Sequence, residues 1–197
     1  EKKESLLKQL SESRFPNLKR LSCSFFPSSS KMMDPVKELE SIEQVIINSP
    51  NLEELHLINI VPSKKMSSPK IKIFEGQWMD MPRSKLTVEH LDDIKDFLSN
   101  CPLIENLTVK VDHIAQIVNL SPVLSLLKKL KLLYLEHWIS ALVYRGMVDP
   151  TDNYLGILIR SLRKLPWLMK AQWTGPKLGQ RRDQWMKVFP RLMLTQK

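Results

Sequence analysis

Glycine is scarce in this sequence, and the few glycines present do not form a phosphate-binding loop. Such loops carry glycines at fixed short spacings, as in GxGxxG or GxxxxGKS, because the backbone must approach the phosphate closely. Here the five glycines are scattered singly along 197 residues: Gly76, Gly146, Gly156, Gly175 and Gly179. Phosphate-loop chemistry is therefore not expected.

Motifs for catalysis and metal binding are also missing. None of the four histidines has a convincing catalytic or metal-binding partner. The best candidate, His90-Leu91-Asp92-Asp93, begins an amphipathic segment, where acidic residues favour the positive end of a helix dipole. No serine or cysteine nucleophile motif is recognisable. We therefore expect a protein that is not an enzyme and has no catalytic residues, no metal site and no cofactor.

Cysteines and long apolar runs are few. Cys23 and Cys101 occupy related places in two similar segments, where a small apolar side chain suits an interior, so we expect both to be free, buried thiols. No apolar run approaches the roughly 18 to 20 residues of a membrane span, and residues 1–14 are too charged for a secretory signal. These features predict a soluble intracellular protein, cytoplasmic or nuclear. The chain opens at Glu1 without Met, which suggests a fragment or excised domain.

Acidic residues are nearly missing from the C-terminal end. From residue 160 onward Asp183 stands alone against ten Lys or Arg, whereas the first 159 residues hold 20 residues of each sign. The net charge of +9 therefore belongs to one end of the molecule. The expected basic surface consists of Arg160, Arg163, Lys164, Lys170, Lys177, Arg181, Arg182, Lys187 and Arg191, with Lys197 as the tenth cation.

Aromatic residues are interspersed with these cations, at Trp167, Trp173, Trp185 and Phe189. Two roles for these aromatic residues are consistent with the sequence. The rings can close the open end of a repeat core, which terminal repeats require. Alternatively, rings and cations together can form a groove for nucleic acid or an acidic protein. The two roles are compatible, since the rings can face inward while the charges face solvent.

What the sequence does contain is a recurring segment, Pro followed by Leu-x-x-Leu-x-Leu. The best copy is Ser49–Leu57, and Phe15–Cys23 and Cys101–Val109 repeat it. Leu165–Ala171 is a degenerate copy of the repeat, and Leu127–Leu132 keeps the leucines without the Pro. The irregular spacing of these copies lies within the range of leucine-rich and related repeats once an unmarked copy at residues 85–88 is counted.

Apolar periodicity predicts the elements between and within these copies. Strands are expected where apolar residues alternate, and helices where they recur every three or four residues after a capping Asp-Pro pair. Residues 70–74 alternate and predict either an extra strand or an insertion hairpin. The other predicted strands are 18–26, 52–60, 85–88, 104–111, 130–135, 169–173 and 192–194, and the predicted helices include 34–48, 91–100, 155–164 and 181–189.

These units predict an α/β fold, a leucine-rich-repeat solenoid with mainly parallel strands on one face and helices on the other. Each strand and helix pair has one apolar face, so it must stack on a neighbour to bury it. We expect residues 1–197 to form a single degenerate leucine-rich-repeat domain, with an N-terminal cap at 1–14, an insertion at 61–84 and a basic C-terminal cap at 165–197.

The segment Cys101–Val109, preceded by a helix ending at residues 96–100, resembles the irregular leucine-rich repeats of F-box substrate receptors. Ser49–Leu57 looks like the same unit, and the resemblance covers about residues 15–173. It implies a curved solenoid whose surface holds a target for ubiquitination by a cullin-based ligase. The partner would then be a ubiquitin-ligase adaptor or its target.

The resulting functional hypothesis is a protein-recognition scaffold without enzymatic activity, with no membrane contact. A nucleic-acid-associated adaptor, using the basic C-terminal end, is the alternative. In either case the polar residues that alternate with the repeat leucines should point away from the core. The candidate protein-binding residues of this strand face are Lys19, Glu53, Glu54, His56, Glu105, Asn106 and Lys131.

Overall fold

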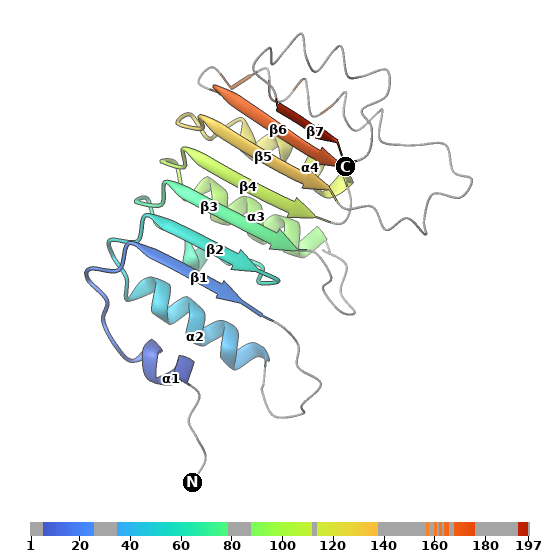
Figure 1. Ribbon diagram of the computed structural model, residues 1–197. Coiled ribbons are helices and arrows are strands. Elements are labelled where there is room, and N and C mark those ends of the chain that lie inside the picture. Colours follow the sequence, from blue (N-terminus) through green and yellow to red (C-terminus); the bar gives the residue numbers. More distant parts are fainter. Residues whose placement is uncertain are drawn as a thin grey trace.

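The computed structural model describes residues 6–25, 35–78, 88–111, 114–137, 168–175 and 193–196, together with positions 157, 160, 162, 164 and 165. Its centre is one sheet in which the strands lie side by side in chain order, and every neighbouring pair is parallel (Figure 1). The strands are β1 (Arg20–Ser24), β2 (Glu54–Ile58), β3 (Ile73–Trp78), β4 (Asn106–Val111), β5 (Leu132–His137), β6 (Lys170–Gly175) and β7 (Met193–Gln196).

Helices follow one another along one side of this sheet. In Figure 1, α3 and α4 lie behind the strands, and the 3-10 helix η1 contacts both α2 and α3. Among the described helices none lies on the other side of the sheet, and we call that side the open face. The helices are α1 (Leu6–Ser11), α2 (Pro35–Ile47), η1 (Lys64–Met66), α3 (Val88–Ser99) and α4 (Ile114–Leu124). The predicted leucine-rich-repeat arrangement, with parallel strands on one face and helices on the other, is confirmed.

The Leu-x-x-Leu-x-Leu pattern is explained by burial. Leu52 lies just before β2, and Leu55 and Leu57 lie within it; none of the three is exposed to solvent. Successive residues of a strand point to opposite faces, so Leu55 and Leu57 share the helix side of the sheet. Leu52 lies in the turn before the strand, where its amide donates to the carbonyl oxygen of Ser49. In the next copy the same places hold Ile104, Leu107 and Val109, at most 1% exposed.

In two copies of the repeat the residue before the proline is small and buried in the turn that follows the helix. Ser49 is 1% exposed, and its hydroxyl donates to the carbonyl oxygen of Val45 at 2.6 Å. Cys101 occupies the same place one copy later, and burial raises the pKa of its thiol to about 12. In the first copy this place holds Phe15, which is half-buried. Both cysteines are free, as predicted, but Cys23 is only half-buried.

The expected insertion at residues 61–84 contains a regular strand of the sheet. Of the two possibilities for residues 70–74, the extra strand is the one present, and β3 lies between β2 and β4 from Ile73 onward. The connection from β2 to β3 carries the short η1 instead of an α-helix. Large side chains fill the space that a helix would occupy, and the most buried are Met66, Ile71, Phe74 and Trp78.

Other predicted elements compare as follows. The strand expected at 85–88 is wrong at Val88, which begins α3, and residues 85–87 lie outside the described residues. The terminal strands appear as β6 and β7, and positions 157, 160 and 162 of the expected third helix are helical. The expected helix at 181–189 lies outside the described residues. In the part of the chain that is described, no helix has the length and apolar character needed to cross a bilayer.

Candidate functional site

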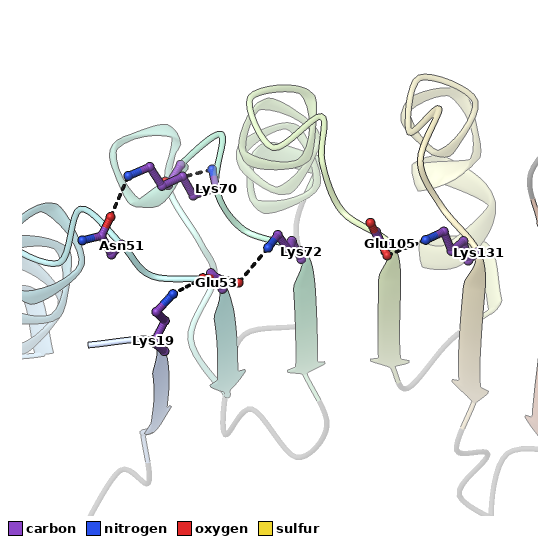
Figure 2. Close-up of polar contacts among 8 residues, drawn as sticks. Lys19, Asn51, Glu53, Lys70, Lys72, Glu105 and Lys131 are labelled. Carbon is purple, nitrogen blue, oxygen red and sulfur yellow. Dashed lines mark hydrogen bonds and ion pairs between the residues drawn. The ribbon is translucent and has the colours of Figure 1, made fainter. Parts of the chain in front are cut away.

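Charged side chains form a row along the edge of the sheet where successive strands begin. We call this row the entry ladder, and Figure 2 shows it crossing the starts of β1 to β5. Its charges alternate in sign along the sheet. The members of the entry ladder, in order, are Lys19, Glu53, Lys72, Glu105 and Lys131.

Ion pairs connect most of the entry ladder. Glu53 lies between two cations: one carboxylate oxygen contacts the Lys19 ammonium, and the other lies 2.8 Å from the Lys72 Nζ. Glu105 pairs with Lys131 at 2.8 Å. Every member is at least 32% exposed, so each pair contributes little to stability. The ladder therefore presents a polar surface whose charges are largely neutralised among themselves.

The backbone holds the ladder residues in register. The carbonyl oxygen of Lys19 accepts hydrogen bonds from two successive amides of the next unit, those of Glu53 at 2.9 Å and Glu54 at 3.0 Å. The same double acceptance recurs at the carbonyls of Glu53, Lys72 and Glu105. Because parallel strands lie about 4.8 Å apart, this repeated backbone bond brings each ladder side chain within reach of the next.

The ladder cations shift the acidity of its carboxyl groups. Hydrogen bonds from Lys19 and then Lys72 lower the pKa of Glu53 to about 2, against an ordinary value of 4.5. The hydrogen bond from Lys131 lowers the pKa of Glu105, and the hydrogen bond to Glu53 raises the pKa of Lys72. The folded ladder thus favours the charged form of each of these groups.

We expect the free energy of unfolding to fall as the pH is lowered from about 4.5 toward 2. Above that range Glu53 is ionised in both the folded and the unfolded chain, so its stabilising effect is fully present. As the pH falls, the unfolded chain takes up the proton first, and the effect is lost by the time folded Glu53 is protonated near pH 2. Urea unfolding across this range measures the loss.

Glu53→Gln should show a shallower dependence on pH than the original protein. About 1 M salt should also reduce the difference in pH dependence between the variant and the original protein, because the ion pairs are partly exposed and therefore screened. If the free energies of unfolding of Glu53→Gln and of the original protein depended on pH in the same way in low salt, a stabilising role for the ladder would be contradicted.

A second group of charges lies further along the strands, and we call it the His56 cluster. The His56 ring contacts a carboxylate on each side: Nε2 lies 2.6 Å from Oε1 of Glu54, and Nδ1 lies 2.8 Å from Oε2 of Glu75. Each carboxylate also binds a cation, since Arg20 Nε lies 2.6 Å from Glu54 and Lys110 Nζ lies 2.7 Å from Glu75. Four neighbouring strands, β1 to β4, thus supply one connected network.

The cluster is more buried than the entry ladder. The side chains of Glu54, His56, Glu75 and Lys110 are only 15% to 26% exposed. Desolvation raises the pKa of Glu75, but hydrogen bonds from Lys110 and His56 outweigh it, so the pKa is lowered overall. The same opposition applies to Glu54, where hydrogen bonds from His56 and Arg20 prevail over desolvation. Both carboxyl groups are thereby kept ionised on the open face.

The structure gathers most of the predicted strand-face residues into these two groups. Four predicted residues belong to the entry ladder, and Glu54 and His56 belong to the cluster. Asn106 is half-buried at the start of β4, where it pairs in register with Leu132. Sequence reasoning missed Arg20, Lys72, Glu75 and Lys110. The alternation in Lys70–Phe74 signalled a strand. The Ser68-Pro69 pair before it corresponds to Ser49-Pro50, a copy of the repeat that was not recognised from the sequence and that aligns β3 with β2.

The basic surface is described only in part. Arg160 and Lys164 are exposed, and Lys170 begins β6. Trp173 also lies in β6. The remaining predicted cations Arg163, Lys177, Arg181, Arg182, Lys187 and Arg191, and the rings of Trp167, Trp185 and Phe189, lie outside the described residues.

Comparisons with known proteins add little to this picture. No family model matches the chain, and no curated protein matches its sequence. Among solved structures, the chain is similar to a tropomodulin C-terminal domain from Caenorhabditis elegans, with a TM-score of 0.44 and 13% identity. That match covers 94% of this chain and 89% of the other. At this level the likeness carries no functional argument, so the fold rests on strand order and register.

Metal chemistry has no evident place in the described residues, where no group of three or more His, Cys, Asp or Glu side chains could hold an ion. In the His56 cluster both ring nitrogens already contact carboxylates. The ring and the carboxylates of the cluster are therefore paired with one another and with the two cations.

Proposed function

We propose that the protein is a non-enzymatic recognition scaffold that binds a partner protein on its open face. The observation that carries the proposal is the array of ion-paired side chains on β1 to β5, in which the entry ladder lies at the strand starts and the His56 cluster lies further along the strands. The backbone register holds these side chains, so a partner would not need to order them on binding. Such pre-organisation reduces the entropy lost in a complex.

The pattern of charge favours a folded protein or a peptide as the partner. Positive and negative side chains alternate over short distances, so the array attracts neither a polyanion nor a polycation as a whole. Charges arranged in this way select a partner with the complementary pattern and disfavour others through like-charge contacts. The half-buried carboxylates of Glu54 and Glu75 are the strongest candidates for selective contacts, since they are the least exposed anions of the array.

We propose further that the recognised protein is a target or an adaptor of an F-box-type ubiquitin ligase. The support for this step is the resemblance of Ser49–Leu57 and Cys101–Val109 to the repeats of F-box substrate receptors. In such an assembly the repeat domain holds the target, and the ligase chemistry belongs to other subunits. No cofactor is then needed in this chain.

Removal of the two cluster carboxylates should weaken partner binding. The full-length protein would be isolated with an Skp-like adaptor and its bound proteins, and the contacts mapped by cross-linking. We expect cross-links on the open face, and at least about a tenfold loss of affinity for the cross-linked partner in the double variant Glu54→Ala, Glu75→Ala, as for central interface residues.

The matched control is the double variant Glu89→Ala, Asp92→Ala, which removes the same charge from exposed positions on α3. It should bind as the original protein does. A loss of affinity in this control alone, or cross-links confined to the helix side, would contradict the open face as the binding surface. Absence of the adaptor with partner binding intact would contradict only the ligase assignment.

The basic C-terminal end supports a second candidate, a nucleic-acid-associated adaptor. Its ten cations against one acid would neutralise phosphates, and Arg160 and Lys164 are exposed. Binding of that kind weakens steeply as salt is raised, because each phosphate contact releases a counterion. Contacts on the alternating open face would respond to salt much less, since its charges are already paired with one another.

A further inference from the structure

A pocket of about 310 Å³ lies at the end of the sheet where the strands finish. Phe25 follows β1 and Asn59 follows β2, while α2 and α3 contribute the opposite walls. The volume is at the lower limit of sites that hold small organic ligands. The lining residues are Phe25, Leu39, Ile42, Asn59, Ile60, Val61, Ser63, His90 and Asp93.

The walls of the pocket are mainly apolar. Phe25 supplies an aromatic ring, and Ile42 and Ile60 are both 4% exposed and belong to the core. Leu39 is 37% exposed on α2. A compact apolar group can therefore enter without displacing the core.

Asn59, which lines this pocket, carries an unsatisfied acceptor. Its backbone adopts a φ of 57°, a left-handed conformation that asparagine tolerates. The side chain is 8% exposed, and its Oδ1 is buried with no hydrogen-bond partner among the described residues. A buried acceptor that lacks a donor is destabilising, and a bound donor removes that penalty. Rotation of the amide about its Cβ–Cγ bond would bring this oxygen to a donor in the pocket.

A second acceptor lies at the rim. Asp93 is an exposed residue in the second turn of α3, and its carboxylate faces a pocket to which the described chain contributes no Lys or Arg. The hydroxyl of Ser63 already donates to Glu43. His90 also lines the pocket and takes part in another interaction. The polar chemistry that the pocket offers beside it is that of two acceptors, one neutral and one negative, against apolar walls. Its complement is an apolar body that carries a positively charged donor.

We propose that this pocket binds a small arylalkyl amine. The aromatic ring packs against Phe25 and the aliphatic side chains, and the protonated amine donates to the oxygens of Asn59 and Asp93. The proposal does not rest on the function of the open face, because none of the pocket residues belongs to the entry ladder or the His56 cluster.

The test uses three probes that share one ring and differ in charge. Tryptamine carries an amine, 3-ethylindole is neutral and indole-3-propionate is an acid. Titration of the full-length protein, followed by calorimetry or by ligand-observed NMR, should show tryptamine binding most tightly and the acid not binding. Equal binding of all three, or no binding of tryptamine, would overturn the proposal.

Variants locate the site. Asp93→Asn should lower the affinity for tryptamine by up to about fivefold, the size expected for one partly exposed charge contact. Asn59→Gly keeps the left-handed backbone but removes the acceptor. It should lower the affinity for tryptamine by about tenfold. Neither variant should change the weak binding of 3-ethylindole by more than about twofold.

Leu39→Arg should block the pocket and abolish tryptamine binding. The control is Ile47→Arg, the same kind of change at a 50% exposed position at the end of the same helix, which should leave binding unchanged. If Leu39→Arg binds tryptamine normally, the amine binds elsewhere and the proposal is wrong. It is also wrong if tryptamine never binds but Leu39→Arg loses the protein partner, since the pocket then accepts a side chain of that partner.

Discussion

Leu133→Asp is expected to unfold the protein, whereas Leu132→Asp, one residue earlier on β5, is expected to leave it folded. Leu133 is 2% exposed and faces the helices, and Leu132 is 41% exposed on the open face. The two substitutions introduce the same charge into the same strand. Their difference therefore measures the orientation of the sheet and nothing else.

The size of the effect follows from burial of an unpaired charge. Leu133 pairs in register with Leu107 and Ala171, which are both 1% exposed, so a carboxylate there has no partner and little water. Such a substitution is expected to destabilise by about 4–5 kcal/mol or more, a large part of the total stability of a domain. Leu132→Asp should change stability by less than about 1 kcal/mol.

Circular dichroism and urea unfolding of both purified variants measure this difference. A Leu133→Asp variant that stays soluble and melts cooperatively near the original temperature would contradict the assignment of the core face. Leu107→Asp and Leu55→Asp provide independent repeats of the test in β4 and β2, at positions that are 1% and 0% exposed.

Gly76→Ala is expected to destabilise the protein by about 1–3 kcal/mol, as overpacking of a filled core does. Gly76 lies in the middle of β3 under the indole of Trp78. A Cβ atom added there would lie 2.2 Å from Cη2 of Trp78. The indole cannot easily move, because it is 1% exposed and its Nε1–H donates to the carbonyl oxygen of Ile60 at 2.7 Å. For a chain of this size the melting temperature should fall by about 2–10 °C.

The sign of this effect separates packing from backbone propensity. A glycine in a strand interior ordinarily makes the folded protein less stable than an alanine there would, by about 0.5–1 kcal/mol. Without the clash against the Trp78 indole, Gly76→Ala would therefore stabilise the protein. In a Trp78→Leu background the ring is removed, and the same change should cost much less or become favourable. A double-mutant cycle measures this coupling, and a coupling free energy near zero would contradict the contact between the two residues.

Much of the fold was predictable because the signal for it is local. In Ser49–Leu57 the spacing of the leucines reports both the strand and the face that it buries, and every one of those leucines is in the core. The turn before the strand was also predictable, since the residue before a proline is disfavoured in a helix and the preceding helix therefore ends there. β3 carries the same marks in weaker form. Ser68 and Pro69 precede it at the repeat spacing, but the connection before it contains only the 3-10 helix η1, and its glycine is explained only by Trp78 two residues away.

The candidate site was predicted less completely, and the reason is also physical. Glu54 and His56 lie two residues apart on one strand, so their common face follows from strand geometry. Glu75 and Lys110 come from β3 and β4, at distances along the chain that no local pattern relates to His56. They join the cluster only because the strands pair in register.

The sequence by itself therefore determined the repeating unit, the core side of β2 and β4 and the charge of the C-terminal end, because these follow from composition and periodicity. In β5 the predicted copy Leu127–Leu132 was wrong by three residues: Leu132 is exposed, and the register with β4 shows that the buried copy is Leu130, Leu133 and Leu135. The tertiary structure alone decided which strands are neighbours. That choice set the sign of each successive charge in the entry ladder, placed two carboxylates around His56 and left the amide oxygen of Asn59 without a donor. Strand neighbours are chosen by the packing of the whole core, and no single segment contains that information.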